Sequence, residues 1–266
     1  TAAHPPAAFG RADCDRRLPL HLALEEQRDV GVVNEVVRLT AEHFPAAVAA
    51  PAVPHSFPGA DELPLHLALR HQKDAGVVAE VLRLTCEHAA PTGLAHAGRD
   101  GALPLHLALE HQDNAGLVME VVRITAEHCT TAFGQQTEGS FPLHIALTKQ
   151  REAYVVIKVL RLTSKHHPEA FSHALAGPDG RLPLHLAMEH QRDVRVLIRT
   201  LRLTTKHHSS GVAQEDGGGR LAVNVAREFQ RDLGVVLEVL KVTAEYFLRE
   251  IAPVIEPTPW WAGLPS

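Results

Sequence analysis

The sequence predicts an all-α solenoid of about six helix-turn-helix repeats, each about 40 residues long. A hexapeptide of the form Leu/Phe-Pro-Leu-His-Leu/Ile-Ala occurs five times, and a second histidine follows each motif histidine after 22 residues. No segment alternates apolar and polar residues as a strand does. The five motif prolines are Pro19, Pro64, Pro104, Pro142 and Pro183, and a degenerate sixth copy carries Ala222 at this position. Successive copies are 45, 40, 38, 41 and 39 residues apart, so a constant unit is followed by a connection of variable length.

The motif itself predicts the first helix of each repeat. Pro19 suits the first turn of a helix, where a backbone N–H has no intrahelical partner. In the first copy we expect this helix to run from about Pro19 to Gln27 and to bury Leu20, Ala23 and Leu24.

A second helix follows after a short turn. Asp29 precedes a Val-rich run and is a good N-cap residue, so the helix is expected over about Val30 to His43. Val33, Val36, Val37 and Thr40 have the spacing of one helical face. The equivalents of Asp29 are Asp74, Asn114, Glu152, Asp193 and Asp232, all but Glu152 being favourable caps.

One hairpin cannot bury its apolar face alone, so the repeats are expected to fold as a stack with atypical ends. We assign residues 15–251 to the array, 1–14 to an N-terminal extension or the remnant of an upstream repeat, and 252–266 to a tail rich in Pro and Trp. The sixth copy, where Arg227 replaces Leu or Met, suits an end cap.

The hexapeptide resembles the Thr-Pro-Leu-His-x-Ala signature of ankyrin repeats. Its Pro, Leu, His and Ala match in all five copies, and Asp100-Gly101 and Asp179-Gly180 resemble the turn that precedes the ankyrin motif. The resemblance covers about residues 15 to 251. It implies stacked helix pairs with projecting loops, and protein–protein recognition as the function.

The repeats also depart from the ankyrin pattern. Leu or Phe replaces the leading Thr, Gln replaces the Gly-His turn between the helices, and the period is near 40 rather than 33. The chain is therefore a divergent ankyrin-like array, and a HEAT-like two-helix solenoid is the alternative fold.

Composition agrees with an intracellular helical stack. Hydrophobic residues make up 45% of the chain but aromatic residues only 5%, as expected of cores built from Leu, Val and Ala. The three cysteines form no disulfide framework, which favours reduced thiols in a cytoplasmic or organellar compartment. The sequence shows neither a secretory signal nor an apolar run long enough to span a membrane, so we expect a soluble protein that is not secreted.

The 19 histidines do not predict a metal site. Equivalent side chains in successive hairpins should lie roughly 8–10 Å apart, whereas a zinc ion holds nitrogens at about 2 Å. We instead expect His21 and its equivalents to bond backbone at the start of the first helix. No nucleophile elbow or phosphate-binding loop is present, so we expect no catalysis, no cofactor and no small-molecule substrate.

Charge distinguishes the copies. On the second helix, three positions of one face read Glu, Arg, Glu in copies one to three and Glu, Lys, Glu in copy six. Copies four and five replace all three with cations, so residues 149–208 carry 11 basic and 5 acidic side chains, against 15 basic and 26 acidic elsewhere. This face is either a solvated surface or a site for an anionic partner.

We therefore predict a scaffold or adaptor subunit of a larger assembly, whose partner is another protein with an acidic surface. Binding of nucleic acid or an anionic membrane through copies four and five is the alternative. The connection from Phe44 to Asp61 is the longest and the least suited to a helix, and it is either a partner-binding finger or a tolerated insertion. The two tryptophans of the tail either contact a partner or cap the last helix. The candidate partner-binding residues are Lys158, Arg161, Lys165, Arg195, Arg199, Arg202, Lys206, Trp260 and Trp261.

Overall fold

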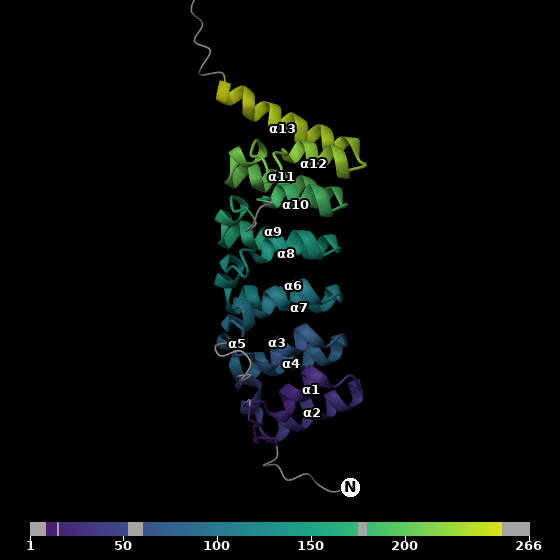
Figure 1. Cartoon of the computed structure of the whole chain (residues 1–266), viewed down its shortest axis with the longest axis vertical. Coiled ribbons are helices and arrows are strands. Elements are labelled where there is room, and N and C mark those ends of the chain that lie inside the picture. Colours follow the sequence, from purple (N-terminus) through teal and green to yellow (C-terminus); the bar gives the residue numbers. More distant parts are fainter. Residues whose placement is uncertain (1–8, 15, 53–60, 175–179, 252–266) are drawn as a thin grey trace, which may run out of the picture. The chain divides into compact units, whose positions relative to one another are not determined.

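The computed structural model describes residues 9–14, 16–52, 61–174 and 180–251. The chain forms two compact units, and the boundary between them lies between Ala170 and Phe171. Both units are all-α arrays of ankyrin-like helix pairs (Figure 1). The described residues contain no strand, only isolated bridges such as Ala52–Glu62 and Glu215–Leu221.

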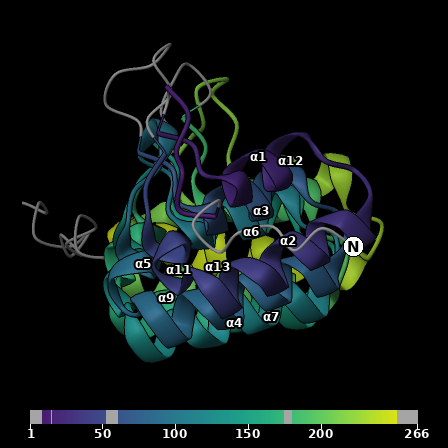
Figure 2. The same cartoon turned by 90° about the horizontal axis from the view of Figure 1, so that it is seen from below.

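The first unit contains four helix pairs. Their bounds are α1 (Pro19–Glu26) with α2 (Val30–His43), α3 (Pro64–His71) with α4 (Ala75–Ala89), α6 (Pro104–His111) with α7 (Ala115–His128), and α8 (Pro142–Lys149) with α9 (Ala153–His166). The short motif helices α1, α3 and α6 lie on one side and the longer helices α2, α4 and α7 on the other (Figure 2). Each helix packs on its equivalent in the next pair, which confirms the predicted stack within this unit.

The second unit contains two pairs, α10 (Pro183–His190) with α11 (Val194–His207), and α12 (Ala222–Phe229) with α13 (Leu233–Ile251). The helices α10 and α12 pack on each other, as do α11 and α13. The degenerate sixth copy thus forms the same hairpin as the other five.

The connections contain more helix than the sequence predicts. Short turns follow the second helices as η2 (Pro45–Ala49), α5 (Thr92–Ala95), η4 (Thr130–Gly134), η5 (Pro168–Phe171) and η6 (Ser209–Val212), and η3 (Arg99–Gly101) precedes α6. The Phe44–Asp61 connection, expected to be the least suited to a helix, begins with the 3-10 turn η2. Pro45 fits the first position of a 3-10 turn, and Ala47 and Val48 after it are buried.

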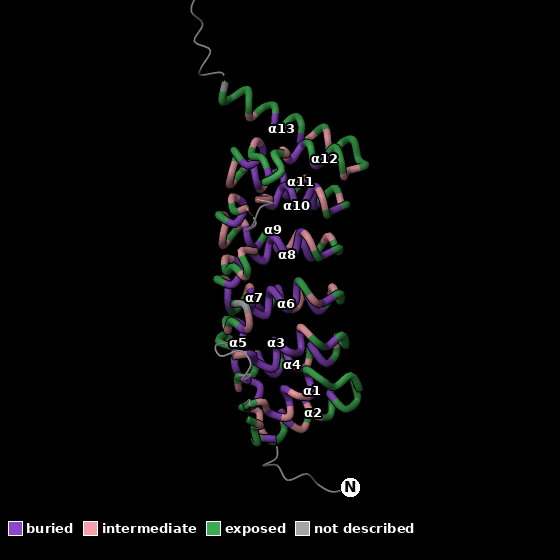
Figure 3. The backbone as a smooth tube through the Cα atoms, in the orientation of Figure 1, coloured by how far each residue is buried: buried purple, intermediate pink, exposed green. Residues whose placement is uncertain are grey.

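The core of each unit runs along the contacts between successive pairs (Figure 3). In α3 the motif residues Leu65, His66, Leu67, Ala68 and Leu69 are all buried. In the first unit, α3 and α6 each pack against the motif helix before and after them, so both sides of these hairpins are covered.

The caps of the second helices agree with the sequence. Asp29, Asp74, Asn114 and Asp193 each accept a hydrogen bond from a backbone N–H of the first turn. Glu152 makes no such bond, because its side chain is one methylene longer than that of Asp.

Candidate functional site

The motif histidines join each first helix to the connection that follows the second helix. In the third copy the backbone N–H of Leu103 donates to Nδ1 of His106 at 3.2 Å, and Nε2 lies 3.1 Å from the Gln135 carbonyl. His21 makes the same two bonds, to the Leu18 N–H and the Ala50 carbonyl. His66 makes them to the Leu63 N–H and the His96 carbonyl. The expected backbone bond at the helix start is therefore confirmed, and the second bond to the distant connection is new.

These bonds hold the histidines neutral. Because Nδ1 accepts a backbone N–H, the ring proton is on Nε2, which donates to the carbonyl. Burial lowers the pKa of His21, His66 and His106 to about 4, although the bonded carbonyl raises it in each case. Both nitrogens are occupied, so these rings are structural groups rather than bases or metal ligands.

Glutamines between the two helices link successive pairs. The Gln112 Nε2 amide donates to the Leu69 carbonyl at 2.6 Å and to the Gln72 carbonyl at 3.0 Å. Gln72 makes the same pair of bonds to Leu24 and Gln27. Each glutamine thus satisfies the C-terminal carbonyls of the preceding motif helix, and the residue that replaces the ankyrin turn has a structural role.

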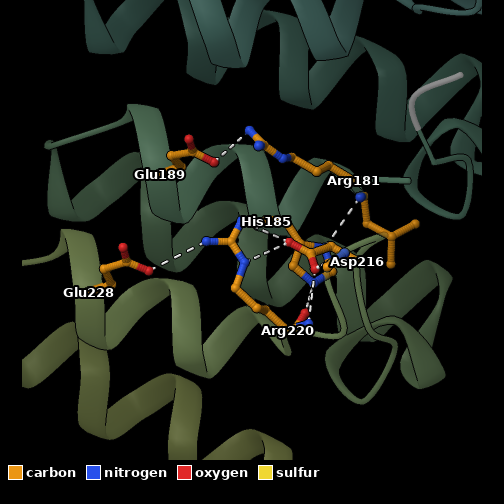
Figure 4. Close-up of polar contacts among 8 residues, drawn as sticks. Arg181, His185, Glu189, Asp216, Arg220 and Glu228 are labelled. Atoms are coloured by element: carbon orange, nitrogen blue, oxygen red, sulfur yellow. Dashed lines mark hydrogen bonds and ion pairs between the residues drawn. The ribbon is translucent and has the colours of Figure 1, made fainter. Parts of the chain in front are cut away.

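A polar cluster fixes the turn before α12 in the second unit (Figure 4). The buried Asp216 carboxylate accepts hydrogen bonds from the backbone N–H groups of Gly218 and Arg220 and from the Arg220 guanidinium. Burial raises the pKa of Asp216, but these hydrogen bonds outweigh it and the net shift is downward. The Arg220 carbonyl in turn accepts from His185 at 3.1 Å.

Ion pairs hold the segments before α12 and α10 against these helices. Arg220 pairs with Glu228 at 3.4 Å and Arg181 with Glu189 at 2.8 Å, each eight residues apart (Figure 4). In the first unit Glu62 and Arg70 form an equivalent pair with the charges exchanged. These pairs were not predicted from the sequence, although opposite charges recur at this spacing.

In the Glu-Arg-Glu faces of copies one to three, each arginine is ion-paired with both glutamates. Arg38 pairs with Glu35 at 2.7 Å and with Glu42 at 3.1 Å. On α7, Arg123 pairs with Glu120 at 2.6 Å and with Glu127 at 2.7 Å, and Arg83 on α4 lies between two glutamates likewise. The Glu35 pKa is lowered, chiefly by its hydrogen bond to Arg38. On α13, Glu238, Lys241 and Glu245 repeat the sequence pattern with no ion pair among them in the described part of the chain.

The helices of copies four and five present cations without such partners. Arg161 and Lys165 on α9 are exposed and Lys158 is half-buried. On α11 the side chains of Arg199, Arg202 and Lys206 are all exposed. Among the described residues, no carboxylate lies within ion-pair distance of these six cations. We call them the α9 triplet and the α11 triplet.

The remaining candidates differ from the triplets. Arg195 is exposed but paired with Asp193 at 2.7 Å, and that contact lowers the pKa of the aspartate. Trp260 and Trp261 lie outside the described residues, as do residues 53–60 of the Phe44–Asp61 connection. No three His, Cys, Asp or Glu side chains in the described ranges are grouped so that they could hold a metal ion. Nor does any described helix have both the length and the apolar character to cross a membrane.

Of the comparisons with known proteins, the one with solved structures gives matches. No family model matches the chain, and the search of curated proteins returned no match. Among solved structures, the chain is similar to the ankyrin repeat domain of Bcl-3, described as a unique member of the IkappaB protein family. The two share 19% sequence identity with a TM-score of 0.43, over 85% of this chain and 99% of that chain.

Proposed function

We propose that the chain is a non-catalytic scaffold or adaptor, a subunit of a larger assembly, that binds a protein with an acidic surface through the α9 and α11 triplets. The observation that carries the proposal is the contrast between equivalent arginines. Arg38, Arg83 and Arg123 are each held by two glutamates, whereas Arg161 and Arg202 occupy the same register position with none. Unpaired guanidinium groups retain their donors for a partner carboxylate.

The spacing of the cations along each helix also supports the proposal. Each triplet has the i, i+3, i+7 spacing that places its side chains on one face. A group of cations attracts an acidic surface over about one Debye length, roughly 8 Å at physiological salt. Binding through them should therefore weaken as the salt concentration rises.

Two further features support the proposed class and compartment. Both ring nitrogens of the motif histidines are committed to backbone bonds, so these side chains have a structural role. Cys14, Cys86 and Cys129 are free thiols, as expected of a reducing intracellular environment.

Charge reversal at equivalent positions tests the proposal. Arg161→Glu and Arg202→Glu, singly and together, should abolish recovery of the native partner from an extract. Arg83→Glu is the matched control, because it makes the same substitution at the same register position of a face where the arginine is already ion-paired. All variants should keep their helix content, since exposed charges contribute less than about 1 kcal/mol each.

Direct binding measurements separate the two classes of partner. We expect the chain to bind a poly-glutamate peptide in a salt-sensitive manner that requires Arg161 and Arg202. Salt-sensitive binding to duplex DNA or to phosphatidylserine vesicles, without binding to the peptide, would instead support the nucleic-acid or membrane alternative. Equal partner recovery by the double variant and by Arg83→Glu would show that the triplets are only solvated faces.

A further inference from the structure

The first long helix, α2, exposes a stripe that every later helix of its unit buries. Val32 is 45% exposed, and Val36 and Leu39 are half-buried. Their equivalents on α4 are Val77, Val81 and Leu84, which are at most 2% exposed. The α4 stripe is covered because α2 packs against it, so the α2 stripe has the chemistry of an interface with a helix of the same kind.

The exposed stripe borders a hollow. An apolar cavity of about 510 Å³ lies between it, Phe9 and Pro19, with Glu35 as the charged side chain in its lining. A flat, solvated helix face would have neither a cavity of this volume nor three aliphatic side chains along one side of the helix. The hollow is suited to receive aliphatic side chains of a partner helix.

The last helix, α13, is exposed along most of its length (Figure 3), and its exposed apolar residues lie on the face opposite to the α2 stripe. Leu240 is 50% exposed and Leu237 is 63% exposed, while Val236 is half-buried. The equivalents of Leu240 on α2 and α4 are Val37 and Leu82, each 1% exposed. In those copies the position is covered by the following long helix, so α13 offers the face that α2 offers to α4.

We infer that two copies of this chain associate head to tail, with α13 of one copy packed on the α2 stripe of the next. This contact would repeat the one between α2 and α4, with Val236 and Leu240 where Val33 and Val37 lie. The flanking charges also continue the internal pattern, since Glu238, Lys241 and Glu245 would lie beside Glu35, Arg38 and Glu42 as one Glu-Arg-Glu face lies beside the next.

This contact differs in kind from a two-fold dimer. The two surfaces are different, so each copy keeps one free end and can accept a further copy. The inference involves neither triplet, so it stands or falls separately from the proposed function.

Analytical ultracentrifugation of the full chain tests the inference. We expect the average mass to rise with concentration beyond that of a dimer. Val36→Glu and Leu240→Glu should each be monomeric, because one end of every copy is blocked. Val194→Glu is the matched control, since Val194 is an exposed valine of similar accessibility, 41%, on α11, and it should assemble as the unmodified chain does.

A mixture of the two blocked variants gives the sharpest outcome. Val36→Glu retains an intact α13 and Leu240→Glu an intact α2, so the mixture should form dimers and nothing larger. A monomeric unmodified chain at all concentrations would overturn the inference whatever the variants do. It is also overturned if the mixture stays monomeric, or if one blocked variant dimerises with itself, which would indicate a two-fold contact. Circular dichroism of each variant confirms that the helices are retained.

Discussion

At the scale of single residues, the repeated polar side chains connect backbone segments that are far apart in the sequence. His106 bonds both the start of α6 and the connection that follows α7, and Gln112 bonds the end of the preceding motif helix. The repetition of these residues therefore reflects architecture. The binding that we propose uses residues that differ between copies, the cations of α9 and α11.

Replacing a motif histidine should be costly. His106→Leu leaves the Leu103 N–H and the Gln135 carbonyl without their partner in a buried setting, and we expect a loss of about 2–4 kcal/mol in the free energy of unfolding. Urea denaturation measures it. His128→Leu is the control, because His128 is exposed, and its effect should stay within about 0.5 kcal/mol. Equal stabilities for the two variants would contradict the structural role.

Acidification should destabilise the fold. The pKa of His21, His66 and His106 is lowered to about 4 by burial, whereas unfolded histidine titrates near 6.5. Between about pH 7 and pH 4 the unfolded state therefore binds more protons than the folded state, so stability falls with falling pH. Urea denaturation across this range should show the loss, and His106→Leu should reduce the slope. Constant stability over the window would refute the assignment.

The glutamine link is expected to contribute to the stability of the stack. Gln112→Leu removes two hydrogen bonds to buried carbonyls of the preceding pair, at a cost of about 1–3 kcal/mol. Gln136→Leu, at an exposed position of a connection, should have little effect in the same denaturation experiment. A neutral Gln112→Leu would mean that water replaces the amide at no cost.

At the scale of helices, the caps explain both the uniformity of the long helices and one exception. Five described caps, Asp232 among them, use Asp or Asn to hold the first turn, and Glu152 does not. The difference is one of side-chain length, since the shorter carboxylate reaches the first-turn N–H groups from the cap position.

Exchanging the two acids gives a reciprocal prediction. Glu152→Asp should stabilise the chain by about 0.5–1 kcal/mol, because it supplies the missing cap of α9, and Asp74→Glu should destabilise it by a similar amount at α4. Thermal unfolding of both variants measures the changes. The account of the cap fails if the two substitutions shift the midpoint in the same direction.

At the scale of the whole molecule, the helix bounds follow from the sequence more closely than the contacts between copies. The observed ends of α1 and α2 lie within one residue of those expected from Pro19 and Asp29. The short turns after the second helices were missed because they form by packing against neighbouring helices rather than by local preference. The turn clusters around Asp216 and Glu62 depend on side chains meeting in space, which the repeat period does not reveal.

The charged residues of the candidate site can be predicted from the sequence, but the ion pairs among them cannot. The charge reversal of copies four and five is visible in the sequence. The structure adds that the arginines of α2, α4 and α7 are held between glutamates, and that Arg195 is paired with Asp193. Among the cationic candidates, that contrast distinguishes the six of the two triplets from the paired Arg195, and Trp260 and Trp261 remain untested predictions.

Zero-length crosslinking of the native complex tests the central claim most directly, because carbodiimide joins a lysine amine to a carboxylate in contact with it. The account predicts crosslinks from Lys158, Lys165 and Lys206 to Asp or Glu of the partner, located by mass spectrometry. Lys73 and Lys241 are internal controls, since both are exposed and neither belongs to a triplet. Crosslinks confined to these two lysines would contradict the account.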